Sequence, residues 1–391
     1  MNIRSLSGYI ISIYVSLLGI FIFNRIWSQV LSDYDFGLLL AELRHVSITA
    51  LVLFLPLRFY VLRNQNVSVV LIPLTLSLIF YCVNYIGIKS LSIVITTLVL
   101  ILCSCGATYM TETYVLKGNV DRLSASSIFK ATAPIIASAC FLWFFDPTGI
   151  IEPLIIMSFT TFFFMIFLFG KREIDSSLSI SGVHGNEIKN TNANRNPLFF
   201  DPIFIIGSAL ITYASNFLIL DVMVKGDNVV QTLVLFQTYM MLAQFGSSLN
   251  NITLRTRIAN GKKSIFFKGT LVYGILIGLL SIAIWKLQIL FFKYVWGVDT
   301  ISGSLLSELL VAFGIFFCYR YIFNYILNIF VEQGLSSYLF WLVTLELIAI
   351  GVPYSLGWRI SSIFYLLAFV FSFFALWLYA NRRNHNLISN R

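Results

Sequence analysis

The stretch FGLLLAELRHVSITALVLFLPLRF, from Phe36 to Phe59, is apolar enough to cross a bilayer, yet it contains Glu42, Arg44, His45 and Arg58. A charged side chain near the centre of a membrane-spanning helix costs roughly 3 kcal/mol on insertion scales. Apolar runs of similar length recur along the chain, in which 58% of the residues are hydrophobic and only 11% are charged. Each run is long enough to cross a hydrocarbon layer of about 30 Å. The sequence therefore predicts an all-α polytopic membrane protein.

Breaks at proline, glycine, asparagine and charged residues divide the chain into about twelve candidate transmembrane helices. Their expected limits are 7–29, 36–62, 67–87, 92–116, 124–145, 151–169, 198–220, 229–253, 269–290, 304–326, 335–355 and 360–380. Residues 170–197 form the longest polar stretch, which is rich in Ser, Asn and Gly and is typical of a flexible linker. We therefore expect an N-terminal lobe at 1–169 and a C-terminal lobe at 198–391, each with half of the helices.

The lysine and arginine residues concentrate in the loops on one side of these helices, which predicts that both termini and the linker are cytoplasmic. The opposite loops hold only a few basic residues, namely Lys89, Lys225, Lys286, Lys293 and Arg359. This topological role accounts for the net charge of +9, so we expect no nucleic acid as a partner. The chain also lacks an H-E-x-x-H pattern and a glycine-rich phosphate loop, so we expect no metal, no cofactor and no catalytic residues.

Three arginines inside the apolar runs are the candidates for binding an anionic ligand: Arg25, Arg44 and Arg58. Arg44 and Arg58 are fourteen positions apart and so lie within about 40° of each other on a helix. Arg25 and Arg58 are close to helix ends, where extension of the side chain to the membrane surface is an equally good explanation. Arg44 lies roughly 13 Å of helix from the preceding loop, which favours an interior cavity.

Three buried carboxylates are candidates for ion coupling: Glu42, Asp221 and Glu346. Two of them also allow a purely structural interpretation. Glu42 could neutralise His45 at the i,i+3 position of the same helix, and Glu346 could pair with Arg320 on the neighbouring helix.

The candidate helices at 198–220 and 229–253 hold more amide and hydroxyl side chains than helix packing requires. From these polar residues we select Tyr213, Asn216 and Asn250 as further candidates for binding the ligand in a wet cavity. The excess of arginine nearby indicates an anionic ligand.

Three stretches give the chain a resemblance to a known family: VLSDYDFGLLL (30–40), YVLKGNVDRLSASSIFKA (114–131) and SNFLILDVMVKGDNVVQTLVLFQTYMML (215–242). They resemble the polysaccharide flippases of the multidrug/oligosaccharidyl-lipid/polysaccharide exporter superfamily, particularly the O-antigen flippases. The chain departs from that family at two positions. Asn216 stands where many members have Asp, and Gln231 stands where they have Gly.

The resemblance implies two six-helix lobes around a central cavity. It also implies translocation of a polyprenyl-pyrophosphate-linked oligosaccharide, such as an O-antigen or capsule repeat unit, across the bacterial inner membrane by alternating access. The implied partners are this lipid-linked glycan, the bilayer, a polysaccharide polymerase and a chain-length regulator. A pyrophosphate crossing hydrocarbon needs compensating charge, for which arginine offers fixed donors.

Two other classes of protein remain open. A small-molecule or drug exporter of the same superfamily would be expected to bind cations, and so to favour carboxylates over arginines. A membrane polysaccharide polymerase would be an enzyme with a large extracytoplasmic loop. The only long loop here is predicted to be cytoplasmic and lacks a plausible acid/base pair.

Overall fold

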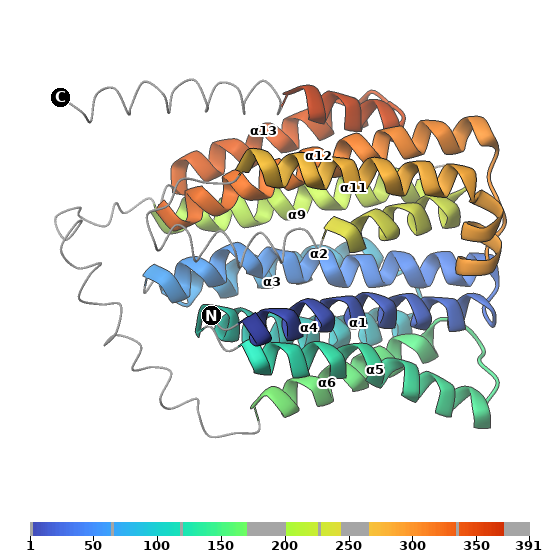
Figure 1. Ribbon diagram of the computed structural model, residues 1–391. Coiled ribbons are helices and arrows are strands. Elements are labelled where there is room, and N and C mark those ends of the chain that lie inside the picture. The colour runs from blue at the N-terminus through green and yellow to red at the C-terminus, as the bar shows by residue number, and fades with distance from the viewer. Residues whose placement is uncertain are drawn as a thin grey trace, which may run out of the picture. The chain divides into compact units, whose positions relative to one another are not determined.

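A computed structural model describes residues 3–63, 66–117, 120–169, 201–225, 228–243, 266–333 and 336–370, and within these ranges the chain is helical without a β-strand (Figure 1). The helices are α1 (Ile3–Ser28), α2 (Asp33–Arg63), α3 (Ser68–Tyr85), α4 (Leu91–Lys117), α5 (Val120–Phe144), α6 (Ile151–Phe169), α9 (Asp201–Lys225), α11 (Phe266–Lys286), η2 (Leu290–Trp296), α12 (Gly303–Gln333) and α13 (Ser336–Ser355). The all-α prediction is confirmed for these residues. The predicted linker at 170–197 lies outside them.

Seven of the described helices are long and apolar enough to cross a membrane, or eight if α11 and η2 together form one bent span. Shorter apolar helices at Tyr14–Ser28, Ile151–Ile166, Val229–Ala243 and Ile360–Val370 fall within the other predicted ranges. These features indicate a multi-pass membrane protein. The arrangement of twelve helices in two lobes stays a prediction.

The predicted helix at 269–290 is wrong at its C-terminal end. Helix α11 ends at Lys286, and the chain then bends by 91° into the π-helix η2. Gly297 ends η2 with a positive φ of 73°, a conformation that glycine adopts without strain. The helices on both sides of the bend are apolar, so the range expected from the sequence extends past Lys286.

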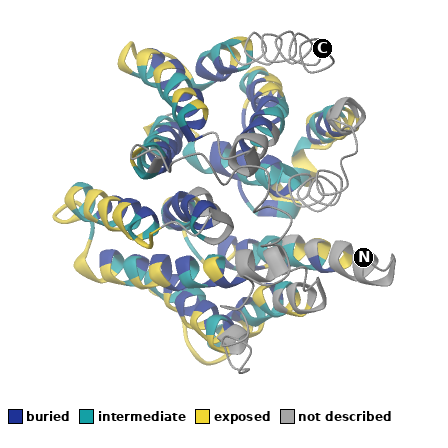
Figure 2. Cartoon of the chain, turned by 90° about the vertical axis from the view of Figure 1, so that its left-hand side faces the viewer, coloured by how far each residue is buried: buried dark blue, intermediate teal, exposed yellow. Residues whose placement is uncertain are grey.

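The chain divides into two compact units, and boundaries between them fall inside helices α1, α2, α9 and α13. Unit 1 comprises Met1–Phe23, Glu42–Tyr213 and Gly334–Phe340, and unit 2 comprises Asn24–Ala41, Ala214–Gln333 and Trp341–Arg391. Figure 2 shows that along many helices buried residues alternate with exposed ones, so that one helix face is covered and another is open. An open apolar face on such a helix is suited to contact with lipid.

Unit 1 is built around α4, which lies beside α5 and α6 (Figure 1). The absence of a side chain at Gly106 lets α4 approach α6, because a Cβ atom there would collide with Met165. The hydroxyl of Ser158 on α6 donates to the Leu154 carbonyl of its own helix (2.8 Å) and also lies 3.5 Å from the Thr96 carbonyl of α4. Close contact between small and flexible side chains is the usual basis of helix packing in membranes.

Unit 2 has an aromatic core in which α12 is the central element. Phe236, from the helix Val229–Ala243, lies against Phe317 of α12 with ring centroids 5.2 Å apart. Phe364, from the helix Ile360–Val370, stacks on Phe316 at 4.1 Å. Aromatic contacts of this kind hold three helices of unit 2 together.

Candidate functional site

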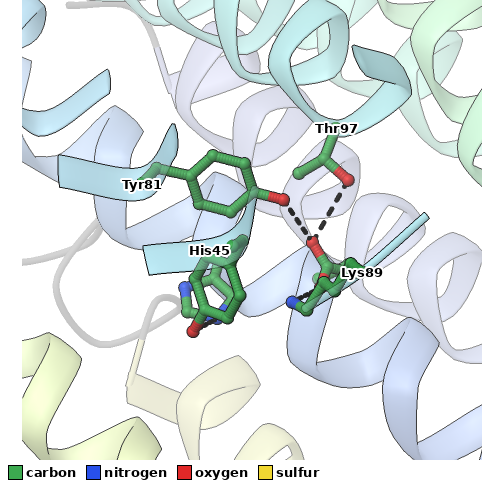
Figure 3. A network of polar contacts seen from close by, with 6 residues as sticks. His45, Tyr81, Lys89 and Thr97 are labelled. Atoms are coloured by element: carbon green, nitrogen blue, oxygen red, sulfur yellow. Dashed lines mark hydrogen bonds and ion pairs between the residues drawn. The ribbon is translucent and has the colours of Figure 1, made fainter. Parts of the chain in front are cut away.

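Glu42 of α2 is buried and is the centre of a polar cluster in unit 1. Figure 3 labels four other members of this cluster, His45, Tyr81, Lys89 and Thr97. The Glu42 side chain is 0% exposed and forms an ion pair through Oε1 with Lys89, which lies in the turn between α3 and α4. Its other oxygen, Oε2, accepts hydrogen bonds from the Tyr81 hydroxyl of α3 (2.9 Å) and from the Thr97 hydroxyl of α4 (3.1 Å). Donors from three neighbouring elements therefore surround one carboxylate.

His45 lies one turn along α2 and extends the cluster. A hydrogen bond of 2.9 Å joins its Nε2 to the hydroxyl of Tyr85 on α3. Its ring also packs edge-on against Tyr85 at 5.0 Å, and the Lys89 ammonium lies 3.6 Å from the centre of the same Tyr85 ring. The spacing within α2 allows a pair between Glu42 and His45. In the structure Glu42 pairs instead with Lys89, which is 47 residues further along the chain.

Arg44, the strongest candidate for ligand binding, is buried in α2 at 6% exposure. Tyr213 of α9, also in unit 1, is 5% exposed and packs edge-on against Phe80 at 5.7 Å. The backbone of Arg58 continues α2, but its side chain lies outside the described residues, as does the whole of Asn250. The structure therefore confirms the burial of Arg44 and Tyr213 and does not describe the other two side chains.

Arg25 belongs to unit 2, where the end of α1 packs on the chain that follows η2. Its guanidinium lies directly over Gly297, and a Cβ atom at that position would collide with Nη1. Nη1 is buried and has no hydrogen-bond partner among the described atoms, and the same holds for Oδ1 of the neighbouring Asn24. A buried donor without an acceptor is costly unless a ligand or water completes it.

Glu346 of α13 forms a second buried carboxylate cluster, in unit 2. Its Oε1 atom pairs with the Arg320 guanidinium of α12 and accepts a hydrogen bond of 2.9 Å from the Tyr319 hydroxyl. The side chain of Glu346 is 0% exposed, and that of Arg320 is 15% exposed. The pairing expected between Glu346 and Arg320 is confirmed.

Asp221 and Asn216, both on α9, have different surroundings. Asp221 is 26% exposed and forms an ion pair of 2.6 Å with Lys225 one turn further on. It also accepts a hydrogen bond of 2.6 Å from the Tyr354 hydroxyl of α13. Asn216 is buried at 4% exposure. Partial exposure places Asp221 at the edge of unit 2, where charges interact weakly with each other.

A groove with a volume of about 580 Å³ runs between α11 and α12 in unit 2. Its walls include small residues on both helices, among them Gly274, Gly278, Gly314 and Cys318, and its other lining is mainly aliphatic. None of the candidate binding residues lines it. The groove therefore contributes no charged group to a site for an anion.

The sequence interpretation missed four members of the Glu42 cluster: Tyr81, Tyr85, Lys89 and Thr97. In the sequence, Lys89 indicates only the topology of the loop in which it lies. A signal was present on α3, because Tyr81 and Tyr85 are four positions apart and so lie on one face of that helix. Among the described residues, no group of three or more His, Cys, Asp or Glu side chains is placed to hold a metal ion.

Comparison with known proteins gives no relative: no protein-family model, no curated protein and no solved structure matches this chain. The class of the protein thus follows from its own features. Long apolar helices with buried ion pairs define an all-helical, multi-pass membrane protein.

Proposed function

We propose that this protein is a flippase, which moves a polyprenyl-pyrophosphate-linked oligosaccharide across the bacterial inner membrane by alternating access. Both termini are cytoplasmic in this proposal, in agreement with the distribution of lysine and arginine between the loops. The protein makes and breaks no covalent bond. It delivers its glycan to a polysaccharide polymerase whose products a chain-length regulator controls.

The observation that carries the proposal is the buried Nη1 atom of Arg25, whose side chain is half-buried. Its Nη1 atom has no hydrogen-bond partner among the described atoms, so at least one charged donor is left to be satisfied. The chain keeps room for this guanidinium by having glycine at position 297. A phosphate oxygen is an acceptor suited to such a donor, because charge-assisted hydrogen bonds to phosphate are about twice as strong as neutral ones.

Arg44 supplies the second support. It is buried within a helix whose composition is otherwise that of a membrane span, where a cation costs roughly 3 kcal/mol. A guanidinium can make charge-assisted hydrogen bonds to an anionic headgroup. A cationic drug would gain nothing from Arg25 or Arg44, so the two arginines favour a flippase over a drug exporter.

The proposal is tested in the native host by deleting the gene and measuring surface polysaccharide and lipid-linked oligosaccharide in the same cells. A flippase predicts loss of surface glycan, with complete repeat units trapped on the cytoplasmic leaflet. Repeat units that reach the outer leaflet but stay unpolymerised would identify a polymerase instead. Unchanged glycan and lipid would contradict the proposal and favour an exporter of small molecules.

Complementation of the deletion strain connects the result to the arginines. Arg25→Ala and Arg44→Ala are expected to restore little surface glycan at normal protein levels, and Arg44→Lys is expected to restore part of it. Arg359→Ala is the matched control, because Arg359 is exposed. Full restoration by Arg25→Ala and Arg44→Ala would show that neither arginine is needed to bind the headgroup.

A further inference from the structure

Helices α11 and α12 lie side by side in unit 2 (Figure 1), and glycine keeps the groove between them open. A Cβ atom at Gly274 or Gly278 would meet no neighbouring atom of the described residues within 4 Å. These positions differ from Gly106, where a Cβ atom would collide with Met165. Glycine at 274 and 278 therefore does not serve to bring two helices together. Its missing side chain leaves space in the groove.

The length of the groove matches one leaflet of a bilayer. Its lining on α11 extends from Gly274 to Trp285, which is eleven residues or about 16 Å of helix. Half of a hydrocarbon core of about 30 Å is about 15 Å. Trp285 is 49% exposed, and tryptophan concentrates at the headgroup level of a membrane. A lipid chain that enters the groove at Trp285 would therefore reach Gly274 near the centre of the bilayer.

Two exposed lysines follow the Trp285 end of the groove. The Nζ atom of Lys286 lies 4.5 Å from the centre of the Trp285 ring, and Lys293 lies in η2, after the bend. Residues 285–298 contain no aspartate or glutamate. Neither lysine forms an ion pair with a described residue. The charge beside the groove is therefore positive and without a protein counter-ion in the described part of the chain.

Topology gives no reason for these lysines. The loops predicted to lie outside the cytoplasm hold only five basic residues, two of which are Lys286 and Lys293, and the positive-inside bias favours none there. The same segment exposes large apolar side chains at Leu287, Ile289 and Tyr294. Lysine next to exposed apolar groups is typical of a segment that lies in the interface of an anionic membrane.

We infer that the groove binds one acyl chain of an anionic phospholipid from the surrounding bilayer, and that Lys286 and Lys293 bind the phosphate of its headgroup. The chain fills the space left by Gly274 and Gly278. The depth of one leaflet fits an acyl chain, whereas a long polyprenyl chain would extend beyond it. The inference does not rest on the proposed function, because neither Arg25 nor Arg44 lines the groove.

Native mass spectrometry of the full-length protein in detergent micelles tests the headgroup site, with dioleoylphosphatidylglycerol and zwitterionic dioleoylphosphatidylcholine as the probes. The wild type should bind phosphatidylglycerol more tightly, by about fivefold for each lysine. Lys286→Gln/Lys293→Gln should bind the two lipids equally. Arg359→Gln removes another exposed cation and is the matched control, which should keep the preference. No preference in the wild type, or an unchanged preference in the double lysine variant, would overturn the inference.

Gly278→Leu tests the groove, because leucine occupies the space that the acyl chain needs. Its matched control is Leu279→Phe, since Leu279 is exposed and does not line the groove. Gly278→Leu should lose the tight binding of phosphatidylglycerol, and Leu279→Phe should keep it. Thermal unfolding should show a stable Gly278→Leu protein, because the new side chain meets open space. Gly274→Leu should behave in the same way, and wild-type affinity in both folded glycine variants would overturn the inference.

Other occupants would give different results in the same experiments. Displacement of phosphatidylglycerol by polyprenyl phosphate at a lower concentration than by phosphatidylglycerol itself would assign the groove to an isoprenoid chain and overturn the inference. A lipid-free dimer that Gly278→Leu abolishes would assign the groove to a second copy of this chain and also overturn it.

These results are independent of the gene-deletion experiment. Phosphatidylglycerol bound in the groove together with unchanged lipid-linked oligosaccharide in the deletion strain would sustain the phospholipid site and refute the flippase. Trapped oligosaccharide together with no preference for phosphatidylglycerol would refute the phospholipid site and sustain the flippase.

Discussion

Each unit contains a buried glutamate that is paired with a cation, and the two pairs are built differently. Glu42 uses both carboxylate oxygens and receives donors from α3, from α4 and from the turn between them. Glu346 receives both of its donors, Tyr319 and Arg320, from α12 and on Oε1 alone, and its Oε2 atom is buried without a hydrogen-bond partner among the described atoms.

The cations in the two clusters also differ. Arginine stays charged at any accessible pH and is rigid, so Arg320 fastens α12 to α13 permanently. Lysine is a flexible point charge, and Lys89 lies in the turn between α3 and α4. The comparison teaches that two equally buried glutamates can be neutralised by different kinds of cation. One cation is carried by a long helix and the other by a turn.

The largest effect is expected from Arg320→Met. The substitution leaves Glu346 buried without a counter-ion, which typically costs about 3–5 kcal/mol, whereas removal of both charges is often close to neutral. The free energy of unfolding, measured in mixed micelles, should therefore fall strongly in Arg320→Met and recover in the double variant Arg320→Met/Glu346→Leu. A double variant as unstable as the single one would show that the pair does more than neutralise charge.

A smaller effect is expected from Lys89→Met, about 1–3 kcal/mol at neutral pH, because Glu42 keeps two hydroxyl donors. The double variant Glu42→Gln/Lys89→Met should recover part of the loss, because no buried charge is then left unpaired. Thermal unfolding of the wild type and the two variants under identical conditions measures this difference. A double variant as unstable as Lys89→Met would contradict a role for Lys89 as the counter-ion of Glu42.

The smallest effect is expected from Tyr81→Phe, about 1 kcal/mol, since Thr97 still donates to the same oxygen of Glu42. Removal of both donors in Tyr81→Phe/Thr97→Val should cost more than the sum of the two single losses, because Oε2 then has no donor. Unfolding of the four proteins under identical conditions measures the coupling. Strict additivity would indicate that the hydroxyls act independently of the carboxylate.

The helices and one of the two clusters could be predicted from the sequence. Apolar runs at 36–62 and 335–355 predict α2 (Asp33–Arg63) and α13 (Ser336–Ser355) closely, because a membrane span needs a continuous apolar stretch. Glu346 and Arg320 are opposite charges inside neighbouring candidate helices. Each needs a partner in hydrocarbon, so their pairing follows from the cost of leaving either alone.

The Glu42 cluster could not be predicted in the same way. Spacing within α2 favours a local partner at His45, whereas the true partner Lys89 is in a loop 47 residues away. A loop lysine has no need of a partner, so its sequence position gives no reason to expect one. The bend after Lys286 was missed because apolar helices lie on both sides of it, and Lys286 and Gln288 interrupt the apolar run only briefly.

The most direct test of the central claim is the binding of polyprenyl pyrophosphate to the purified protein in nanodiscs, with the uncharged polyprenol as a reference lipid. The wild type should bind the pyrophosphate at least about tenfold more tightly than the polyprenol, a difference of about 1.4 kcal/mol. Arg44→Ala and Arg25→Ala should lose this preference, Arg44→Lys should keep part of it, and Arg359→Ala should keep all of it. Equal binding of the two lipids by the wild type, or an unchanged preference in both alanine variants, would contradict binding of the pyrophosphate by these arginines.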